Sequence, residues 1–142
     1  MGDASLISAL CEFQQKVAPI HKLSTAQYGT YADLQTVLGA VTPALSECGL
    51  AVTQGFTTDT QGRTLLVTKL HHVSGQCESS AVPLIAEGGR NALHSWGGAV
   101  TYQRRYAILA ILNLAAGLPD DDGDSVGSKL TTAKPTTADE FF

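Results

Sequence analysis

The residues best suited to chemistry lie between positions 97 and 124, in the segment GGAVTYQRRYAILAILNLAAGLPDDDGD. On a helix, Tyr102 and Tyr106 share a face at i,i+4, and Arg105 lies beside Tyr102 at i,i+3. Arginine forks match phosphate oxygens, and tyrosine rings can stack on bases. A helix start adds free N–H groups and a positive dipole end. This combination is compatible with nucleic-acid binding.

A structural role for the same residues is equally compatible with the sequence. Arg104 and Arg105 are adjacent, so on a helix they project about 100° apart and cannot both be buried. One of them could pair with a core acid while the tyrosines pack, and the candidate acids are Asp33, Glu47 and Glu78. Both interpretations stay open at this level.

A second group of cations falls on the expected strands: Arg63, Lys69, His71 and His72. Lys69 and His71 would lie on one face of a strand and His72 on the other, because side chains alternate. A basic strip could follow a phosphate backbone, and a solvated face is the alternative. Adjacent histidines that point to opposite faces do not form a metal site.

The acidity of the chain is confined to its end. Residues 1–118 hold seven Lys/Arg and seven Asp/Glu, whereas residues 119–142 hold two lysines and six acids, which accounts for the net charge of −4. The overall acidity therefore does not exclude an anionic ligand for the core. The charged content of 15% is low, which favours a neutral polar surface or one covered by partner subunits.

Several function classes are disfavoured. The chain carries no phosphate-binding loop, dinucleotide fingerprint, nucleophile elbow or zinc motif, so we expect no enzyme and no required cofactor. Its three cysteines are odd in number and widely spaced, as in reduced thiols of a cytoplasmic protein. Neither a signal peptide nor a membrane span is predicted. Asp120–Asp122 could bind a divalent cation, although a solvated acidic linker fits the spacing better.

The expected elements give an α+β fold in the order α-α-β-β-β-α, an antiparallel three-stranded meander packed on helices. Apolar spacing predicts helices from Asp3 or Ser5 to Val17 and over residues 31–48, the second bent at Pro43, with residues 19–30 irregular. Strands are expected at residues 51–57, 64–72 and 76–82. The last helix should begin between residues 91 and 98 and end near Ala116, before Gly117 and Pro119.

Two domains are expected. Residues 1–118 form the folded domain, and residues 119–142 form a disordered acidic tail, because few of their side chains can build a core. The last four residues, Asp139, Glu140, Phe141 and Phe142, place two aromatics beside two acids at a mobile end. That composition is typical of a short docking motif.

Several motifs occur in an order that resembles the ERF family of phage single-strand annealing recombinases, over about residues 5–124. The most specific is GGAVTYQRRYA at residues 97–107 followed by DDDG at residues 120–123; weaker ones are YADL at 31–34, PAL at 43–45, GLAVTQ at 49–54 and LHHVSG at 70–75. Gly98 departs from the serine usual in the family's motif, and Val100 and Gln103 depart mildly.

The resemblance implies an annealing-protein-like core that binds single-stranded DNA and pairs complementary strands without ATP, as a homo-oligomeric ring or filament in the host bacterial cytoplasm. Carried over by position, the candidate DNA-binding residues are Thr101, Tyr102, Arg104, Arg105 and Tyr106. Arg63, Lys69 and Arg90 are added for their charge alone. The tip at residues 139–142 is similar to the acidic, phenylalanine-ended tip of bacterial single-stranded DNA-binding proteins, which implies docking of a host DNA-repair or single-stranded DNA-binding protein. The alternative is that the tip mimics DNA and covers the basic groove of its own oligomer.

Two other functions are compatible with the sequence. An oligomeric scaffold without DNA binding would lack salt-sensitive binding to single strands. A metal-dependent nuclease could use Asp120–Asp122, but a second carboxylate cluster is missing from the sequence.

Overall fold

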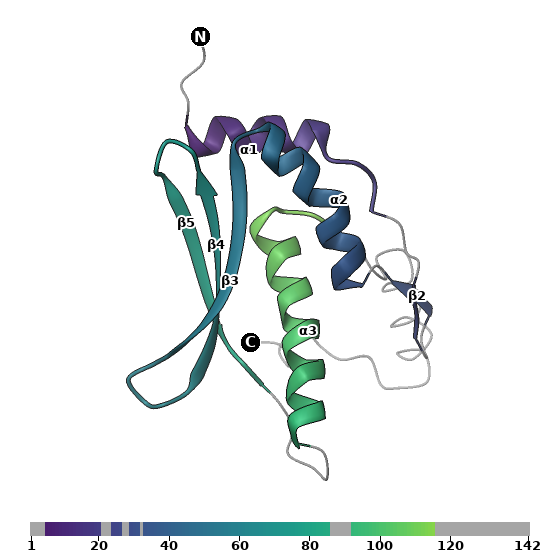
Figure 1. Ribbon diagram of the computed structural model, residues 1–142, viewed down its shortest axis with the longest axis vertical. Coiled ribbons are helices and arrows are strands. Elements are labelled where there is room, and N and C mark those ends of the chain that lie inside the picture. The colour runs from purple at the N-terminus through teal and green to yellow at the C-terminus, as the bar shows by residue number, and fades with distance from the viewer. Residues whose placement is uncertain (1–4, 21–23, 27–28, 32, 86–91, 116–142) are drawn as a thin grey trace, which may run out of the picture.

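The structure is a computed structural model that describes residues 5–20, 24–26, 29–31, 33–85 and 92–115 (Figure 1). Arg90 and residues 116–142, with the expected tail and its tip, lie outside the described residues. The elements in chain order are α1 (Leu6–Lys16), β1 (Ser24–Ala26), β2 (Gly29–Tyr31), α2 (Leu34–Glu47), β3 (Leu50–Thr58), β4 (Thr64–His72), β5 (Cys77–Pro83) and α3 (Ala92–Ile111). The predicted α+β class is confirmed.

The main sheet is the predicted antiparallel meander, with β4 between β3 and β5. The β3–β4 register runs from Leu50 opposite His72 to Thr58 opposite Thr64. Gly62 and Gly75, with φ of 80° and 96°, supply the left-handed residues that the two hairpin turns need. The three helices lie on one side of this sheet, and no other described element covers its second face, which we call the uncovered face (Figure 1).

The core lies between the helices and the covered face of the sheet. Its fully buried side chains come from all three helices and from β4: Phe13, Val37, Val41, Leu66, Leu70, Ile108 and Leu112. Ile108 and Leu109 of α3 and Leu112 just after its end follow one another at helical spacing as a buried stripe. Every residue of the edge strand β5 is exposed, although Gln103 Nε2 of α3 donates to the Pro83 carbonyl at its end at 3.0 Å.

Side-chain caps set the starts of the first two helices. Ser5 Oγ accepts from the Ser8 N–H at 3.2 Å at the start of α1. Asp33 Oδ1 accepts from the Thr36 N–H at 2.8 Å, so α2 begins at Leu34 rather than near Tyr31. The helix then continues through Pro43. Pro43 and Gly39, four residues before it, are both exposed, which leaves the Gly39 carbonyl open to water.

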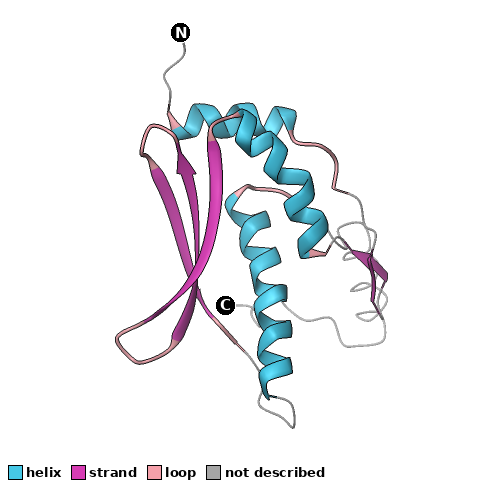
Figure 2. Cartoon of the chain, viewed as in Figure 1, coloured by secondary structure: helices cyan, strands magenta, loops and turns pink. Residues whose placement is uncertain are grey.

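Besides the start of α2, two further predictions are wrong (Figure 2). Residues 24–26 and 29–30, expected to be irregular, and Tyr31, expected to begin the second helix, form the short hairpin β1–β2. The last helix stops at Ile111, well before Ala116. Asn113 takes a left-handed φ of 56°, and the Leu114 N–H donates to the Leu109 carbonyl at 2.8 Å. This is the geometry of a Schellman cap, with asparagine in the place usually held by glycine.

Candidate nucleic-acid interface

The two tyrosines of the motif cover one arginine on α3. The ring centroids of Tyr102 and Tyr106 lie 4.7 Å apart, and the Arg105 guanidinium carbon lies 5.7 Å and 4.6 Å from them. Arg105 is only 7% exposed, whereas Tyr102 and Tyr106 are 59% and 47% exposed. We call these three residues the tyrosine cluster.

The position of Arg105 on the helix explains its burial. Arg105 precedes Ile108, Leu109 and Leu112 by three, four and seven residues, so it begins the buried stripe of α3. The tyrosines then shield the charged end of the side chain and gain cation–π contacts. The cluster therefore presents two exposed aromatic rings backed by a positive charge, a surface on which bases can stack.

Arg104 has a different environment, on the side of α3 that faces β3. Its Nε donates to Gln54 Oε1 at 2.9 Å, and Gln54 Nε2 donates back to the Arg104 carbonyl at 3.1 Å. Gln54 Nε2 also donates to Thr68 Oγ1 at 3.0 Å, and Thr68 is fully buried. This network fixes α3 to the strands and holds Arg104 beside β3. Within the described residues, no carboxylate pairs with Arg104.

The same side of α3 carries a second aromatic pair. Phe56 of β3 and Trp96 of α3 have ring centroids 5.5 Å apart at an interplanar angle of 45°. Both remain well exposed, at 49% and 41%. Trp96 precedes Arg104 by eight residues and therefore lies on the same face of the helix.

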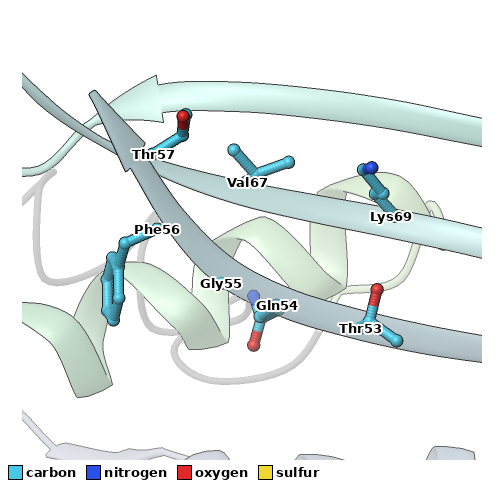
Figure 3. Close-up of a pocket in the computed structure, with 7 residues that line it drawn as sticks. All are labelled: Thr53, Gln54, Gly55, Phe56, Thr57, Val67 and Lys69. Atoms are coloured by element: carbon cyan, nitrogen blue, oxygen red, sulfur yellow. The ribbon is translucent and has the colours of Figure 1, made fainter. Parts of the chain in front are cut away.

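A groove of about 320 Å³ runs along the edge strand β3 and is lined by its residues Thr53, Gln54, Gly55, Phe56 and Thr57 and by Val67 and Lys69 of the neighbouring β4 (Figure 3). We call it the β3-edge groove. In Figure 3, Gln54 and Phe56 project to the opposite side of the sheet from Thr57, Val67 and Lys69. The lining residues thus come from both faces of the sheet, most of them from the uncovered face.

The remaining predicted residues are dispersed. Thr101 is exposed and its Oγ1 donates to the Gly97 carbonyl at 3.0 Å. Lys69 is exposed on the uncovered face of the sheet, so the sheet separates it from the tyrosine cluster. Arg63 lies in the β3–β4 turn, where its Nε is 2.7 Å from Asp59 Oδ2. The structure does not unite these cations into one strip.

The carboxylate of Asp59 accepts hydrogen bonds of the turn that holds Arg63. Asp59 Oδ1 accepts from the N–H groups of Arg63 and Gln61 at 2.8 Å and 2.9 Å. The Arg63 N–H, and then the Arg63 side chain and the Gln61 N–H, hold the pKa of the Asp59 carboxyl below its usual range.

The two histidines lie on opposite faces, as predicted. His71 Nε2 contacts Thr53 Oγ1 at 2.8 Å on the uncovered face, and His72 Nδ1 contacts Ser74 Oγ at 2.8 Å on the helix side. Across the described ranges, no three His, Cys, Asp or Glu side chains come together as metal ligands. Nor is any helix in that part of the chain long and apolar enough to cross a membrane.

Three site residues were missed in the sequence: Gln54, Phe56 and Trp96. The sequence contains a signal that could have identified Gln54 and Phe56. They alternate with Val52 on the covered face of β3, but they are polar or aromatic at the end of the strand that leaves the core. Trp96 has one too, since positions 96, 100 and 104 share a helical face. Their meeting across 40 residues of chain depends on how α3 crosses the sheet.

Comparison with known proteins gives one family. The sequence profile described as the ERF superfamily matches residues 6–140. No curated protein and no solved structure matches the chain. Because the matched region spans nearly the whole sequence and includes every element described above, this chain belongs to the ERF superfamily.

Proposed function

We propose that the chain binds single-stranded DNA and anneals complementary strands during phage homologous recombination, without ATP and as a homo-oligomeric ring or filament. The family supports this proposal, since membership implies a phage single-strand annealing role and the matched residues 6–140 include the GGAVTYQRRYA segment within α3. In this proposal, residues 1–118 carry DNA binding and assembly.

The observation that carries the proposal is the tyrosine cluster. A buried structural pair of tyrosines would hide its rings, whereas Tyr102 and Tyr106 expose theirs and cover Arg105 instead. Exposed rings backed by a cation favour the π-faces of bases and, through the charge, the phosphates beside them.

The mechanism needs no covalent chemistry. Lysine and arginine side chains neutralise phosphates, and the released counterions make binding salt-dependent. A strand held on aromatic faces keeps its base edges free for a complement. Pairing then releases about 1.4 kcal/mol per base-pair step, which drives annealing without ATP.

The test compares two double variants of the tyrosine cluster. Tyr102→Ala/Tyr106→Ala removes both rings, and the matched control Tyr102→Phe/Tyr106→Phe keeps the rings and removes only the hydroxyls, which lie 3.4 Å apart. Stacking is worth about 1–3 kcal/mol per base, so we expect the alanine pair to lose roughly tenfold or more in affinity for single strands. The phenylalanine pair should bind and anneal like the wild type. A folded alanine variant with undiminished annealing would contradict the proposal.

The end of the chain has a separate proposed role. Residues 139–142 combine two acids with two phenylalanines, and we assign them to docking of a host DNA-repair or single-stranded DNA-binding protein. Deletion of residues 138–142 should abolish capture of that partner while leaving annealing of bare oligonucleotides intact. Equal capture by the full-length and shortened chains would remove this role.

A scaffold that assembles without binding DNA is the second candidate, favoured by large apolar side chains on the surface: Ile7, Val73, Ile85 and Leu93, each more than 60% exposed. These side chains suit contacts between subunits. The salt dependence of single-strand affinity distinguishes the two functions. An affinity that falls steeply between about 50 and 200 mM salt identifies the annealing protein.

A further inference from the structure

Phe56 and Trp96 form an aromatic surface on the β3 side of α3, away from the tyrosine cluster. Their rings contact each other at 5.5 Å, yet each keeps more than 40% of its surface exposed. Neither residue belongs to the motif residues discussed for DNA binding. Two large aromatic side chains held together at the surface form a platform on which a planar ligand can stack.

The β3-edge groove begins at this platform and carries the chemistry of a nucleotide site. Phe56 belongs to both, and the groove's lining contains one cation, Lys69, and no acid. Three further lining residues, Thr53, Gln54 and Thr57, offer polar side chains. Beside them, the hydrogen bond from Arg104 Nε to Gln54 Oε1 holds a second cation at the strand.

The floor of the groove is open at Gly55. A Cβ built there would meet nothing within 4 Å, so no internal packing requires a glycine. Its neighbours Gln54 and Phe56 turn their backbone groups to the free edge. Two hydrogen bonds at the ends of the ladder fix which backbone groups of β3 face β4: the Asp59 N–H donates to the Arg63 carbonyl, and the Val73 N–H donates to the Gly49 carbonyl. Because such pairs alternate, the N–H and C=O groups of odd-numbered β3 residues bond to β4, and those of even-numbered residues point to the free edge.

We propose that the β3-edge groove is a second contact site for single-stranded DNA, with a base stacked on Phe56 and Trp96, one phosphate near Arg104 on the helix side and the next phosphate near Lys69 on the other face of the sheet (Figure 3). The strand crosses the edge of β3 at Gly55, where no side chain obstructs it. This inference rests on the proposed function, and it extends DNA contact from the tyrosine cluster to the opposite side of α3.

The charges favour DNA over a second copy of the chain as the occupant. An apolar subunit contact would bury Lys69 and the Gln54–Arg104 network against neutral surface, which leaves cations without a counter-charge. A nucleotide instead matches each component, with a π-face for the aromatic pair and a phosphate for the cations.

The chain reports on this site directly, because Trp96 is its single tryptophan. Oligo(dT) is titrated into the full-length protein while tryptophan emission is recorded, and binding is measured in parallel from the anisotropy of a labelled oligo(dT). Stacking on the platform should quench Trp96 with the same midpoint as the anisotropy. Phe56→Leu, which keeps an apolar side chain but removes the ring, should weaken binding about fivefold or more and reduce the quench.

A steric variant tests the groove without touching any aromatic or charged residue. Gly55→Val fills the open floor and suits a strand, so the fold should persist. Ala51→Val is the matched control, since it adds bulk on the same face of β3 outside the groove. We expect Gly55→Val to lose about fivefold or more in affinity and most of the quench, with Ala51→Val unchanged.

The outcomes separate this site from the proposed function. Tight anisotropy-detected binding with unquenched Trp96 and normal affinity in Phe56→Leu and Gly55→Val would overturn the groove site alone. No binding in either readout would overturn both proposals. A change in Trp96 emission with protein concentration in the absence of DNA, lost in Gly55→Val, would assign the groove to a second copy of the chain and overturn the DNA site.

Discussion

Two adjacent arginines of α3, Arg104 and Arg105, lie on different sides of the helix and have different surroundings. On one side, Arg105 is buried beneath the rings of Tyr102 and Tyr106. On the other, Arg104 is partly buried and held by Gln54 of β3. These residues are adjacent in sequence, and the rotation of about 100° per residue sends one toward the core and the other toward the sheet.

This difference in surroundings indicates separate roles for Arg104 and Arg105, which the sequence motif alone does not distinguish. The Arg105 charge is covered, so it acts on a ligand through the rings above it. Arg104 keeps donors beyond Nε and lies next to a groove with a second cation. We therefore expect substitutions at Arg105 to affect mainly stability and substitutions at Arg104 to affect mainly DNA binding.

Arg105→Ala should produce the largest stability loss of the set. It removes a cation contacted by two rings and the aliphatic stem that starts the buried stripe, which together are worth about 3 kcal/mol of unfolding free energy. Urea denaturation measures the loss. Arg105→Lys keeps a charge and most of the stem, so it should lose about half as much. An alanine variant within 0.5 kcal/mol of wild type would show that the cluster is not structural.

Gln54→Leu should be next, on the other side of the helix. The leucine fills similar volume but leaves buried Thr68 and the Arg104 carbonyl without the amide that bonds them, at a cost of about 2 kcal/mol. Gln54→Glu keeps an acceptor for Arg104 Nε and should lose less. Equal stability of the two variants in urea would mean that the network contributes little.

The sequence predicted the sheet well and the ends of the helices less well. The β4 boundaries, Thr64–His72, are those expected, because alternating apolar residues between two glycine turns leave one register. The end of α3 was wrong because Asn113 takes the left-handed conformation ahead of Gly117. The β1 and β2 strands, three residues each, are too short to show any periodicity.

The candidate site divides in the same way. The motif predicted the tyrosine cluster, since i,i+3 and i,i+4 neighbours on one helix meet wherever the helix lies. It did not predict that Arg105 is the buried arginine, because that choice depends on which face of α3 packs in the core. Gln54, Phe56 and Trp96 were missed for the same reason: their contacts join segments about 40 residues apart or more.

Arg104→Ala should reverse the pattern of Arg105→Ala. One partly buried hydrogen bond is lost, so stability should fall by only about 1 kcal/mol. Single-strand affinity should fall, and the slope of log affinity against log salt should lessen by about 0.7, the contribution of one phosphate contact on single strands. Arg104→Lys should keep that slope. A slope unchanged in Arg104→Ala would remove Arg104 from the DNA site.

Substitution of single tyrosines tests the geometry within the cluster. Tyr106 lies closer to the Arg105 guanidinium than Tyr102 does, 4.6 Å against 5.7 Å. Tyr106→Leu should therefore cost more unfolding free energy than Tyr102→Leu, about 1 kcal/mol against about 0.5. The two variants are compared in one urea series, and the reverse order would contradict the contact distances.

The smallest effect concerns a third arginine, Arg63, which is held by Asp59 in the β3–β4 turn. The folded-state pKa of Asp59 is lowered by the Arg63 N–H and side chain and the Gln61 N–H, so ionised Asp59 stabilises the fold. That stability is fully present above the unfolded pKa of about 3.9 and is lost as pH falls through the lower folded value. Asp59→Asn should therefore lower the thermal unfolding midpoint slightly at pH 7, with the difference closing in acid.

The control for this effect is Glu12→Gln, which breaks the exposed Glu12–Lys16 pair and leaves the turn untouched. Asp59→Asn also releases Arg63 from its carboxylate, and so adds an uncommitted cation at the end of the β3–β4 hairpin. If Arg63 contacts DNA as its charge suggests, single-strand affinity should rise in Asp59→Asn and return to the wild-type value in Asp59→Asn/Arg63→Ala. If single-strand affinity is the same in both variants as in the wild type, the hairpin end carries only a structural ion pair. DNA contact would then be confined to the two sides of α3.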